Sequence, residues 1–208
     1  MPRDQQGLAR LVARQGVAGW IVAAFEAVDR ADFVPAGAKG SIYSDRPVAL
    51  PRRQTTSQPS LIARMLDELA LPEGGAVLEV GTGYGFQTAF LAQRAGRVIS
   101  IERHEELARA ARTNLARASI PNTKVVVGDG WRGVPDEAPF DSIVVSAAAS
   151  ELPPKLSTQL CERGRIIIPI QKLEGDAVYA FEKKDGRVDL RSLVTPARFV
   201  PLVPGPES

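Results

Sequence analysis

The sequence lacks the residues that support disulfide or thiolate-metal chemistry. It has one cysteine, Cys161, and one histidine, His104, among 208 residues. One cysteine excludes an internal disulfide and a cysteine-cluster metal site, so we expect no metal. No run approaches the roughly 18 apolar residues that span a bilayer, and residues 1–15 lack the continuous apolar core of a signal peptide. These absences predict a soluble, cytoplasmic protein with no membrane partner.

A strong charge of either sign is also absent. The chain has 26 basic and 24 acidic residues, which gives a net charge of +2. This value is too small to indicate a nucleic-acid partner or an anionic membrane surface. The 44% hydrophobic and 24% charged residues are ordinary globular values. The length predicts one domain over residues 1–208, which we expect to be a monomer.

The first seventy residues show helical periodicity on both sides of a long loop. Apolar residues recur at helical spacing over residues 8–15, 21–28 and 61–69. Pro59 suits the first turn of the third of these helices. Residues 36–56 hold glycine, proline and serine without any period, which predicts an irregular loop of the kind that often carries function.

From residue 75 the pattern changes to short apolar runs that alternate with helical stretches. This alternation predicts an α/β fold with a doubly wound, mostly parallel sheet over residues 75–170. In residues 171–208 the pattern is β only, with a hairpin around Lys184-Asp185-Gly186 and then a tail. The expected strands are 76–80, 97–102, 124–127, 140–146, 165–170, 177–183 and 187–194, with helices at 104–119 and 153–161, and 197–203 as a strand or ordered loop.

A glycine-rich turn follows the first expected strand. Residues 79–85 read Glu-Val-Gly-Thr-Gly-Tyr-Gly, a GxGxG pattern and not the GxGxxG of dinucleotide-binding proteins. Glu102 ends the second strand, where a carboxylate can accept hydrogen bonds from ribose hydroxyls, and Asp129-Gly130 follow the third. Because ligands bind outside the carboxyl ends of parallel strands, these features predict a nucleoside-containing cofactor at one rim of the sheet.

This arrangement resembles the Rossmann-like class I S-adenosylmethionine-dependent methyltransferases. The resemblance implies S-adenosyl-L-methionine as the cofactor, with Glu102 holding the ribose and with Asp129 and Gly130 flanking the adenine. Nearby acidic residues also suit a sulfonium cation. The cofactor-binding residues that the resemblance implies are Glu79, Gly81, Thr82, Gly83, Gly85, Gln87, Glu102, Asp129 and Gly130.

Five motifs carry a closer resemblance, which covers essentially the whole chain. The motifs are Gln54-Thr55-Thr56-Ser57-Gln58-Pro59, residues 77–89, Gly128-Asp129-Gly130-Trp131, Ala138-Pro139-Phe140-Asp141 and Arg198-Phe199-Val200-Pro201-Leu202-Val203. They resemble the protein-L-isoaspartate O-methyltransferase family and occur in that family's order.

The closer resemblance implies methylation of the free α-carboxylate of L-isoaspartyl residues in damaged proteins or peptides, followed by collapse of the ester to a succinimide. It makes Ser57 the active-site serine and implies Thr55, Thr56, Arg198 and Val200 as substrate-binding residues. Residue type alone also allows Ser57 to cap the following helix. Arg198 could equally meet an acidic acceptor or make a structural ion pair.

Departures from the family pattern leave a second acceptor open. Pro51-Arg52-Arg53 stands where repair enzymes commonly carry glycines, and Thr56 replaces the usual isoleucine. Relatives in peptide natural-product pathways methylate a normal aspartate to give an aspartimide. Two cations beside the acceptor could steer such an acidic peptide.

Three other classes fit less well. After the fourth strand, Ser146-Ala147-Ala148-Ala149 does not supply the Asn/Asp-Pro-Pro-aromatic motif of amino-directed nucleic-acid methyltransferases. The missing GxGxxG spacing disfavours an NAD-dependent oxidoreductase. A non-enzymatic module that keeps the cofactor fold is distinguished only by turnover. We expect His104 to be a solvated helix start and Cys161 to be a packing residue near a helix end.

Overall fold

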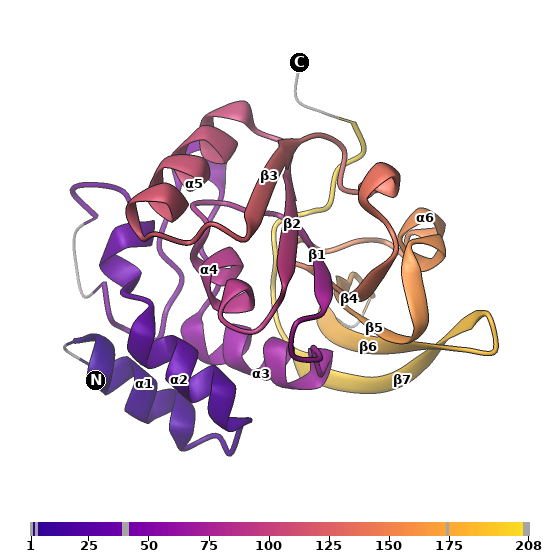
Figure 1. Cartoon of the computed structure of the whole chain (residues 1–208), viewed down its shortest axis with the longest axis horizontal. Coiled ribbons are helices and arrows are strands. Elements are labelled where there is room, and N and C mark those ends of the chain that lie inside the picture. The colour runs from indigo at the N-terminus through magenta and orange to yellow at the C-terminus, as the bar shows by residue number, and fades with distance from the viewer. Residues whose placement is uncertain (1, 3, 39–41, 174, 206–208) are drawn as a thin grey trace.

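The computed structural model describes residues 2, 4–38, 42–173 and 175–205 (Figure 1). The predicted irregular loop therefore falls partly, and the predicted tail mostly, outside the described residues. The α-helices are α1 Gln5–Ala13, α2 Gly19–Ala27, α3 Pro59–Leu69, α4 Phe86–Ala92, α5 Glu105–Arg117 and α6 Pro154–Thr158. The 3-10 helices are η1 Arg30–Phe33, η2 Pro51–Arg53 and η3 Pro135–Glu137. The strands are β1 Ala76–Val80, β2 Arg97–Glu102, β3 Thr123–Val127, β4 Phe140–Val145, β5 Leu160–Ile170, β6 Ala177–Lys184 and β7 Arg187–Pro196.

The seven strands form one sheet in the order β3-β2-β1-β4-β5-β6-β7. Strands β1 to β5 are parallel to one another, whereas β6 pairs antiparallel with both β5 and β7. The mostly parallel sheet and the C-terminal hairpin are thus confirmed. Strand β1 pairs with β2 on one side and β4 on the other, so the strand order reverses there. Ligands of doubly wound sheets bind at this switch point.

Alternate residues of the central strands face two separate cores, as strand geometry requires. Val77 of β1 packs in a large core formed with helices α1 to α5, and Leu78 packs in the opposite core. That second core is covered by α6, through Leu156, and by connecting loops. The central strands are therefore buried on both faces, which explains their nearly continuous apolar runs.

One predicted helix is shorter than expected. The helix predicted over residues 153–161 ends at Thr158, and β5 begins at Leu160 instead of residue 165. Cys161 therefore lies in a strand. The early part of β5 is irregular, with a register shift opposite β4 and Arg163 at a φ of +64°. Glu162 accepts hydrogen bonds from the backbone of the β6–β7 turn, so a long-range contact decides its conformation.

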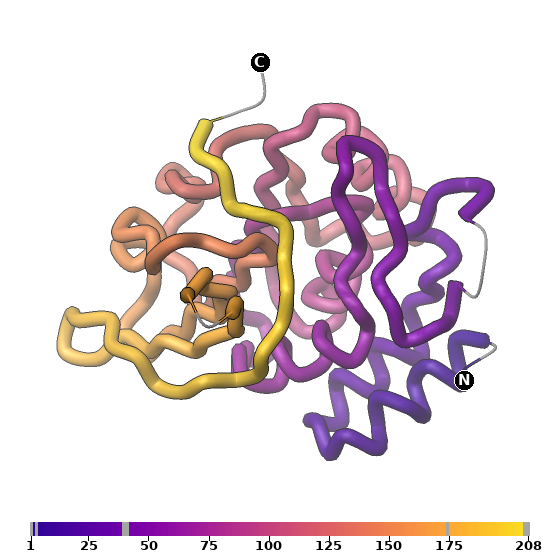
Figure 2. The backbone as a smooth tube through the Cα atoms, turned by 180° about the vertical axis from the view of Figure 1, so that it is seen from behind, coloured from indigo at the N-terminus to yellow at the C-terminus, as the bar shows by residue number. Residues whose placement is uncertain are grey.

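The segment after β7 is an ordered loop that returns across the sheet. Its main chain pairs with the loop after β4, through a bridge between Ala148 and Pro201. Ala148 donates to Val200 and accepts from Leu202, at 2.8 and 2.7 Å. Figure 2 shows this segment running beside the loop that precedes α3, and both line the same groove.

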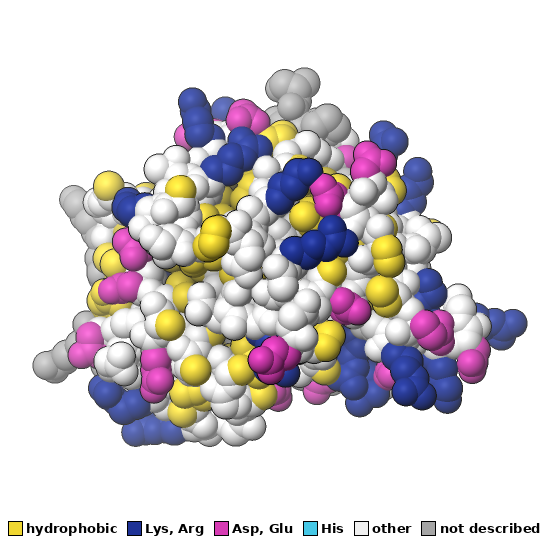
Figure 3. Space-filling view, in the orientation of Figure 1, with side chains coloured by type: hydrophobic (Ala, Val, Ile, Leu, Met, Phe, Trp, Pro, Cys, Tyr) yellow, Lys and Arg dark blue, Asp and Glu magenta, His cyan; other side chains and the backbone are white. Residues whose placement is uncertain are grey.

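The surface carries both signs of charge. In Figure 3, basic and acidic side chains are interspersed over the visible face, as the small net charge predicts. Within the described part of the chain, no helix is long and apolar enough to cross a membrane.

Candidate active site

The glycine-rich turn after β1 has a backbone that only glycine adopts readily. Gly81, Gly83 and Gly85 have φ values of +95°, +56° and +91°, in the left-handed region. Gly85 starts α4, and a Cβ there would lie 3.3 Å from Leu115 of α5. The three glycines therefore make the turn tight and place α4 against α5.

Glu102, the last residue of β2, is fixed beside this turn. Its carboxylate accepts hydrogen bonds from the backbone N–H groups of Gly83 at 2.9 Å, Arg103 at 2.9 Å and His104 at 3.1 Å. The side chain is buried, yet it lines a cavity. The three donors orient the carboxylate, whose roughly four acceptor positions leave capacity towards the cavity.

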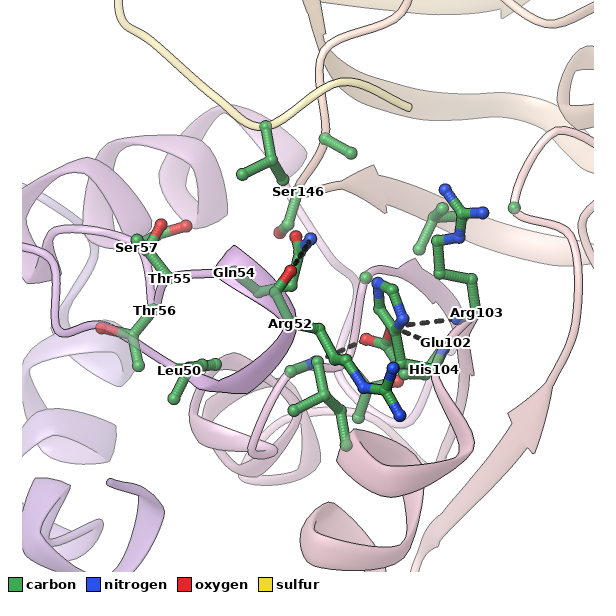
Figure 4. A pocket seen from close by; sticks show the side chains of 18 of the residues that line it. Leu50, Arg52, Gln54, Thr55, Thr56, Ser57, Glu102, Arg103, His104 and Ser146 are labelled. Carbon is green, nitrogen blue, oxygen red and sulfur yellow. Dashed lines mark hydrogen bonds between the residues drawn. The ribbon is translucent and has the colours of Figure 1, made fainter. Parts of the chain in front are cut away.

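This cavity has a volume of about 380 Å³, within the size range of small-molecule sites (Figure 4). Val80, Ile101, Leu107 and Leu202 give it apolar walls. The predicted site residues that line it are Thr55, Thr56, Ser57, Gly81, Thr82, Gly83, Gln87, Glu102, Gly130 and Val200.

Gly130 and Asp129 follow β3 at the same rim, as predicted. A Cβ on Gly130 would lie 2.5 Å from a methyl group of Val80, so any larger residue would push into the wall. Asp129 is not among the lining residues; its carboxylate accepts from the backbone of Trp131 at 2.9 Å. Asp129 thus shapes the loop that places Gly130.

Glu79 lies behind the cavity and does not line it. This fully buried carboxylate accepts from Gln87 at 3.1 Å, from Ser100 at 2.7 Å and from the Thr88 hydroxyl. Gln87 also donates to the Ser146 hydroxyl at 3.0 Å. Burial raises the pKa of Glu79 to about 7, although the three hydrogen bonds oppose the shift. Glu79 therefore positions Gln87, which reaches the cavity.

The raised pKa of Glu79 predicts a pH-dependent stability. A carboxyl group whose pKa rises from 4.5 to about 7 on folding stabilises the fold fully below pH 4.5. We expect this contribution, on the order of 3 kcal/mol, to disappear as the pH rises through about 7. Urea unfolding of wild type and Glu79→Gln from pH 5 to 8 measures it. At pH 8, where Glu79 is ionised, the free energy of unfolding should be higher for Glu79→Gln than for wild type. This difference should shrink towards pH 5, and a difference that does not change with pH would contradict the prediction.

A second hollow, a groove of about 580 Å³, adjoins the first. It runs between the start of α3 and the segment after β7, and Arg198 lies along it. The residues that line both the cavity and the groove are Thr55, Thr56, Ser57, Ser146 and Val200. A molecule in the cavity and a second one in the groove would therefore meet at Ser57 and Ser146.

Ser57 does not cap α3. Gln58 occupies the N-cap position, without a side-chain capping bond. The carboxylate of Asp45 instead accepts from the Ser60 backbone at 2.8 Å. Within the described residues the Ser57 hydroxyl makes no hydrogen bond, so it is available to a ligand. The capping interpretation of Ser57 is therefore wrong.

Thr56 lines both hollows, but its hydroxyl bonds to the protein. Its Oγ1 accepts from the Arg30 guanidinium at 3.1 Å and from the Val48 backbone at 3.0 Å. Figure 4 shows the hydroxyl turned away from the centre of the cavity. Sequence analysis did not single out Arg30 as a functional residue. Its fully buried side chain also donates to the backbone oxygens of Ile42, Ser44 and Arg46.

Arg52 and Arg53 lie at the cavity and are absent from the lining of the groove. They line the same cavity as Ser57, and that they flank the acceptor stays a prediction. Both have left-handed backbones, with φ values of +59° and +58°, a conformation that costs a non-glycine residue roughly 1–2 kcal/mol. Arg52 also pairs with Glu106 at 3.1 Å, which ties this loop to α5.

His104 and Ser146 line the cavity although neither was predicted from the sequence as a site residue. His104 was expected to be solvated, but only 6% of it is exposed and it lines the cavity at the N-terminus of α5. Ser146 was considered only as part of the segment that lacks the Asn/Asp-Pro-Pro-aromatic motif. The signal for Ser146 was its position directly after β4, at the strand end next to β1. For His104 no local signal was available, because charged residues surround it in the sequence.

The cavity fits the nucleoside-containing cofactor that the sequence predicts. It combines a fixed carboxylate, a glycine turn whose backbone a ligand can approach closely, and apolar walls that suit a planar base. Gly83 and Gly130 leave room that a Cβ would fill, since a Cβ would lie 3.3 Å from Leu50 at Gly83 and 2.5 Å from Val80 at Gly130.

Known proteins are similar to this chain in sequence and in fold. Residues 4–207 match the family model described as Protein-L-isoaspartate(D-aspartate) O-methyltransferase. Relatives named Protein-L-isoaspartate O-methyltransferase from Koribacter versatilis and Methanoculleus marisnigri are 43% and 42% identical over 183 residues. These alignments cover 88% of this chain and 82% and 83% of the relatives.

Solved structures described by the same family name have the same fold as this chain. A protein-L-isoaspartate O-methyltransferase superimposes with a TM-score of 0.87 at 32% identity, over 95% of this chain and 65% of that longer one. A Plasmodium falciparum protein described as a putative member, in complex with S-adenosyl-L-homocysteine, gives 0.86 at 27% identity, over 97% and 99% of the two chains. The chain therefore belongs to the protein-L-isoaspartate O-methyltransferase family.

Proposed function

We propose that this chain transfers a methyl group from S-adenosyl-L-methionine to the free α-carboxylate of L-isoaspartyl residues in damaged proteins or peptides. The observation that carries the proposal is the junction of two hollows at Ser57 and Ser146, one suited to the cofactor and one open to a peptide. Family membership over residues 4–207 supports the same reaction.

The chemistry needs little from the protein beyond orientation. The bound cofactor supplies a methyl group on a sulfonium. An acceptor carboxylate has a pKa near 4, so it is ionised at neutral pH and no general base is required. The Ser57 hydroxyl can donate a hydrogen bond that fixes one carboxylate oxygen without protonating it. Holding the two groups in line can remove several kcal/mol of the barrier.

Glu102 is the residue that we assign to the cofactor ribose. We expect Glu102→Ala to weaken binding of S-adenosyl-L-homocysteine about ten- to a hundredfold, since a hydrogen bond to a charged group contributes roughly 1.5–3 kcal/mol. Calorimetry measures the affinity, and a thermal melt checks that loss of the Gly83, Arg103 and His104 contacts leaves the fold intact. Glu26→Ala, an exposed change on α2, is the charge-matched control. An affinity within twofold of wild type would reject the assignment.

The natural-product alternative rested on Arg52, Arg53 and Thr56. The two arginines line the cofactor cavity, and the Thr56 hydroxyl is bonded to Arg30 and Val48. None of the three therefore favours a normal aspartate as acceptor.

The deciding experiment is a radiolabelled methyl-transfer assay on paired peptides that differ only in aspartyl or isoaspartyl linkage. We expect transfer to the isoaspartyl peptide, followed by collapse of the ester to a succinimide. Methylation of normal aspartate at the same rate or faster would overturn the repair assignment. We also propose that the enzyme is a cytoplasmic monomer, and light scattering at working concentration tests the monomer.

A further inference from the structure

The charged side chains that line the groove beside Ser57 are all positive. Fifteen described residues line it, and among them Arg64 and Arg198 are the charged ones. No aspartate or glutamate is in that set. The groove therefore presents cationic groups in a protein whose net charge is only +2.

Arg198 carries a charge that the protein does not neutralise locally. It follows β7 in the segment that returns across the sheet, and its side chain is exposed. Within the described residues Arg198 makes no hydrogen bond or ion pair. Of the two roles that the sequence left open for this residue, the described residues provide no partner for a structural ion pair, which favours the acidic acceptor.

Arg64 extends the cationic character along the groove. It is an exposed residue of α3, the helix that begins two residues after Ser57. Its Nε donates to the side-chain oxygen of Gln15 at 3.2 Å, which is a neutral partner. The acids within one helical turn, Asp67 and Glu68, form no ion pair with it in the described structure, and Asp67 accepts from the Ala18 backbone.

Asp45 contacts two residues that line the groove, Gln58 and Ser60, but does not line it itself. Its two oxygens accept from the Gln58 side chain at 2.9 Å and from the Ser60 backbone at 2.8 Å. Its carboxylate lies at the N-terminus of α3, where negative charge is stabilised. The charged residues that line the groove itself are therefore both cationic.

The spacing of these groups indicates which part of a peptide they would meet. From Pro59 to Arg64 the axis of α3 rises about 7.5 Å, at 1.5 Å per residue. An extended peptide advances about 3.3 Å per residue. A peptide whose isoaspartyl carboxylate lies at Ser57 would therefore bring a side chain two or three residues away to the level of Arg64.

We propose that Arg64 and Arg198 make the acceptor groove selective for isoaspartyl peptides that carry a second carboxylate two or three residues from the damaged site. This inference rests on the proposed function and adds the acceptor's sequence context to it. The two arginines act on binding of the peptide and not on the transferred methyl group. Their effect therefore falls on KM, leaves kcat unchanged and decreases with salt.

The test uses blocked heptapeptides with a central isoaspartyl residue and glutamate, glutamine or lysine two and three residues away on either side. For wild type at low salt we expect a KM about fivefold lower for the glutamate peptides than for the lysine peptides, the size expected for exposed ion pairs. The ratio of KM between the lysine and glutamate peptides should fall in Arg64→Gln and in Arg198→Gln. It should approach one in the double variant. Arg187→Gln, at the opposite end of β7, is the charge-matched control and should keep the wild-type ratio.

Equal KM values for all isoaspartyl peptides with wild type would overturn the inference and leave the proposed function standing. A preference that survives in the double variant would also overturn it. If no isoaspartyl peptide is methylated, including the glutamine one, the proposed function fails and this inference fails with it.

Discussion

Replacement of Ser57 by alanine should lower methyl transfer about a hundredfold and leave cofactor affinity within about twofold of wild type. Ser57 lies where the cofactor cavity and the acceptor groove meet, and its hydroxyl makes no hydrogen bond within the described residues. Loss of this donor would free the acceptor carboxylate to rotate out of line, and misplacement by about 1 Å can cost a factor of a hundred.

Single-turnover transfer to an isoaspartyl peptide and calorimetry with S-adenosyl-L-homocysteine give the two quantities for Ser57→Ala. Since Gln58, not Ser57, occupies the N-cap of α3, the melting temperature should stay near that of wild type. Ser157→Ala, on α6 at the other face of the sheet, is the matched control. Near-normal turnover, or a loss of turnover explained by unfolding, would remove Ser57 from the catalytic assignment.

Replacement of Arg30 by methionine should cost at least about 3 kcal/mol of stability and most of the activity. The guanidinium bonds to the backbone oxygens of Ile42, Ser44 and Arg46, at 2.7–2.9 Å, and to Thr56 at 3.1 Å. Burial lowers the pKa of Arg30 to about 10, so it is still charged at neutral pH. Its removal leaves acceptors of a charged donor unpaired, which is among the larger single-residue penalties.

Urea unfolding and steady-state kinetics together test this role of Arg30. If Arg30 positions the loop before Ser57, kcat should fall even at temperatures where the variant is fully folded. Arg30→Lys keeps the charge but not the planar fork of donors, so it should recover only part of both losses. The exposed Arg14→Met should change neither. Full activity in a folded Arg30→Met protein would contradict the positioning role.

The parts of the fold that were predicted correctly are those with a local cause. The runs that form β1 and β2 are buried on both faces, so their composition alone indicates parallel strands. The glycine turn and Glu102 follow from the same pattern, because strand ends of a doubly wound sheet meet at one rim. The start of β5 was missed because Glu162 is set by contacts with a hairpin turn more than twenty residues later.

The acceptor side was predictable only by resemblance. The hydrogen bonds of Arg30 join it to residues that lie 12 residues away in the sequence, at Ile42, and 26 residues away, at Thr56. No local sequence pattern predicts them. The same holds for Arg52 and Arg53, whose distance from the groove depends on how the loop folds back over the glycine turn. Functional residues at strand ends could therefore be predicted from the sequence, whereas those on loops could not, because distant partners decide where a loop lies.

The return of the C-terminal segment across the sheet determines when the site can exist during synthesis. Leu202 and Val203 form one wall of the cofactor cavity, while Gly81 and Glu102 stand more than ninety residues earlier. Since translation proceeds from the N-terminus, the core strands emerge long before this wall does. A nascent chain can therefore build its sheet while its cavity is still open on one side. The cofactor cavity is complete only after the segment that follows β7 has emerged from the ribosome and packed beside the glycine turn.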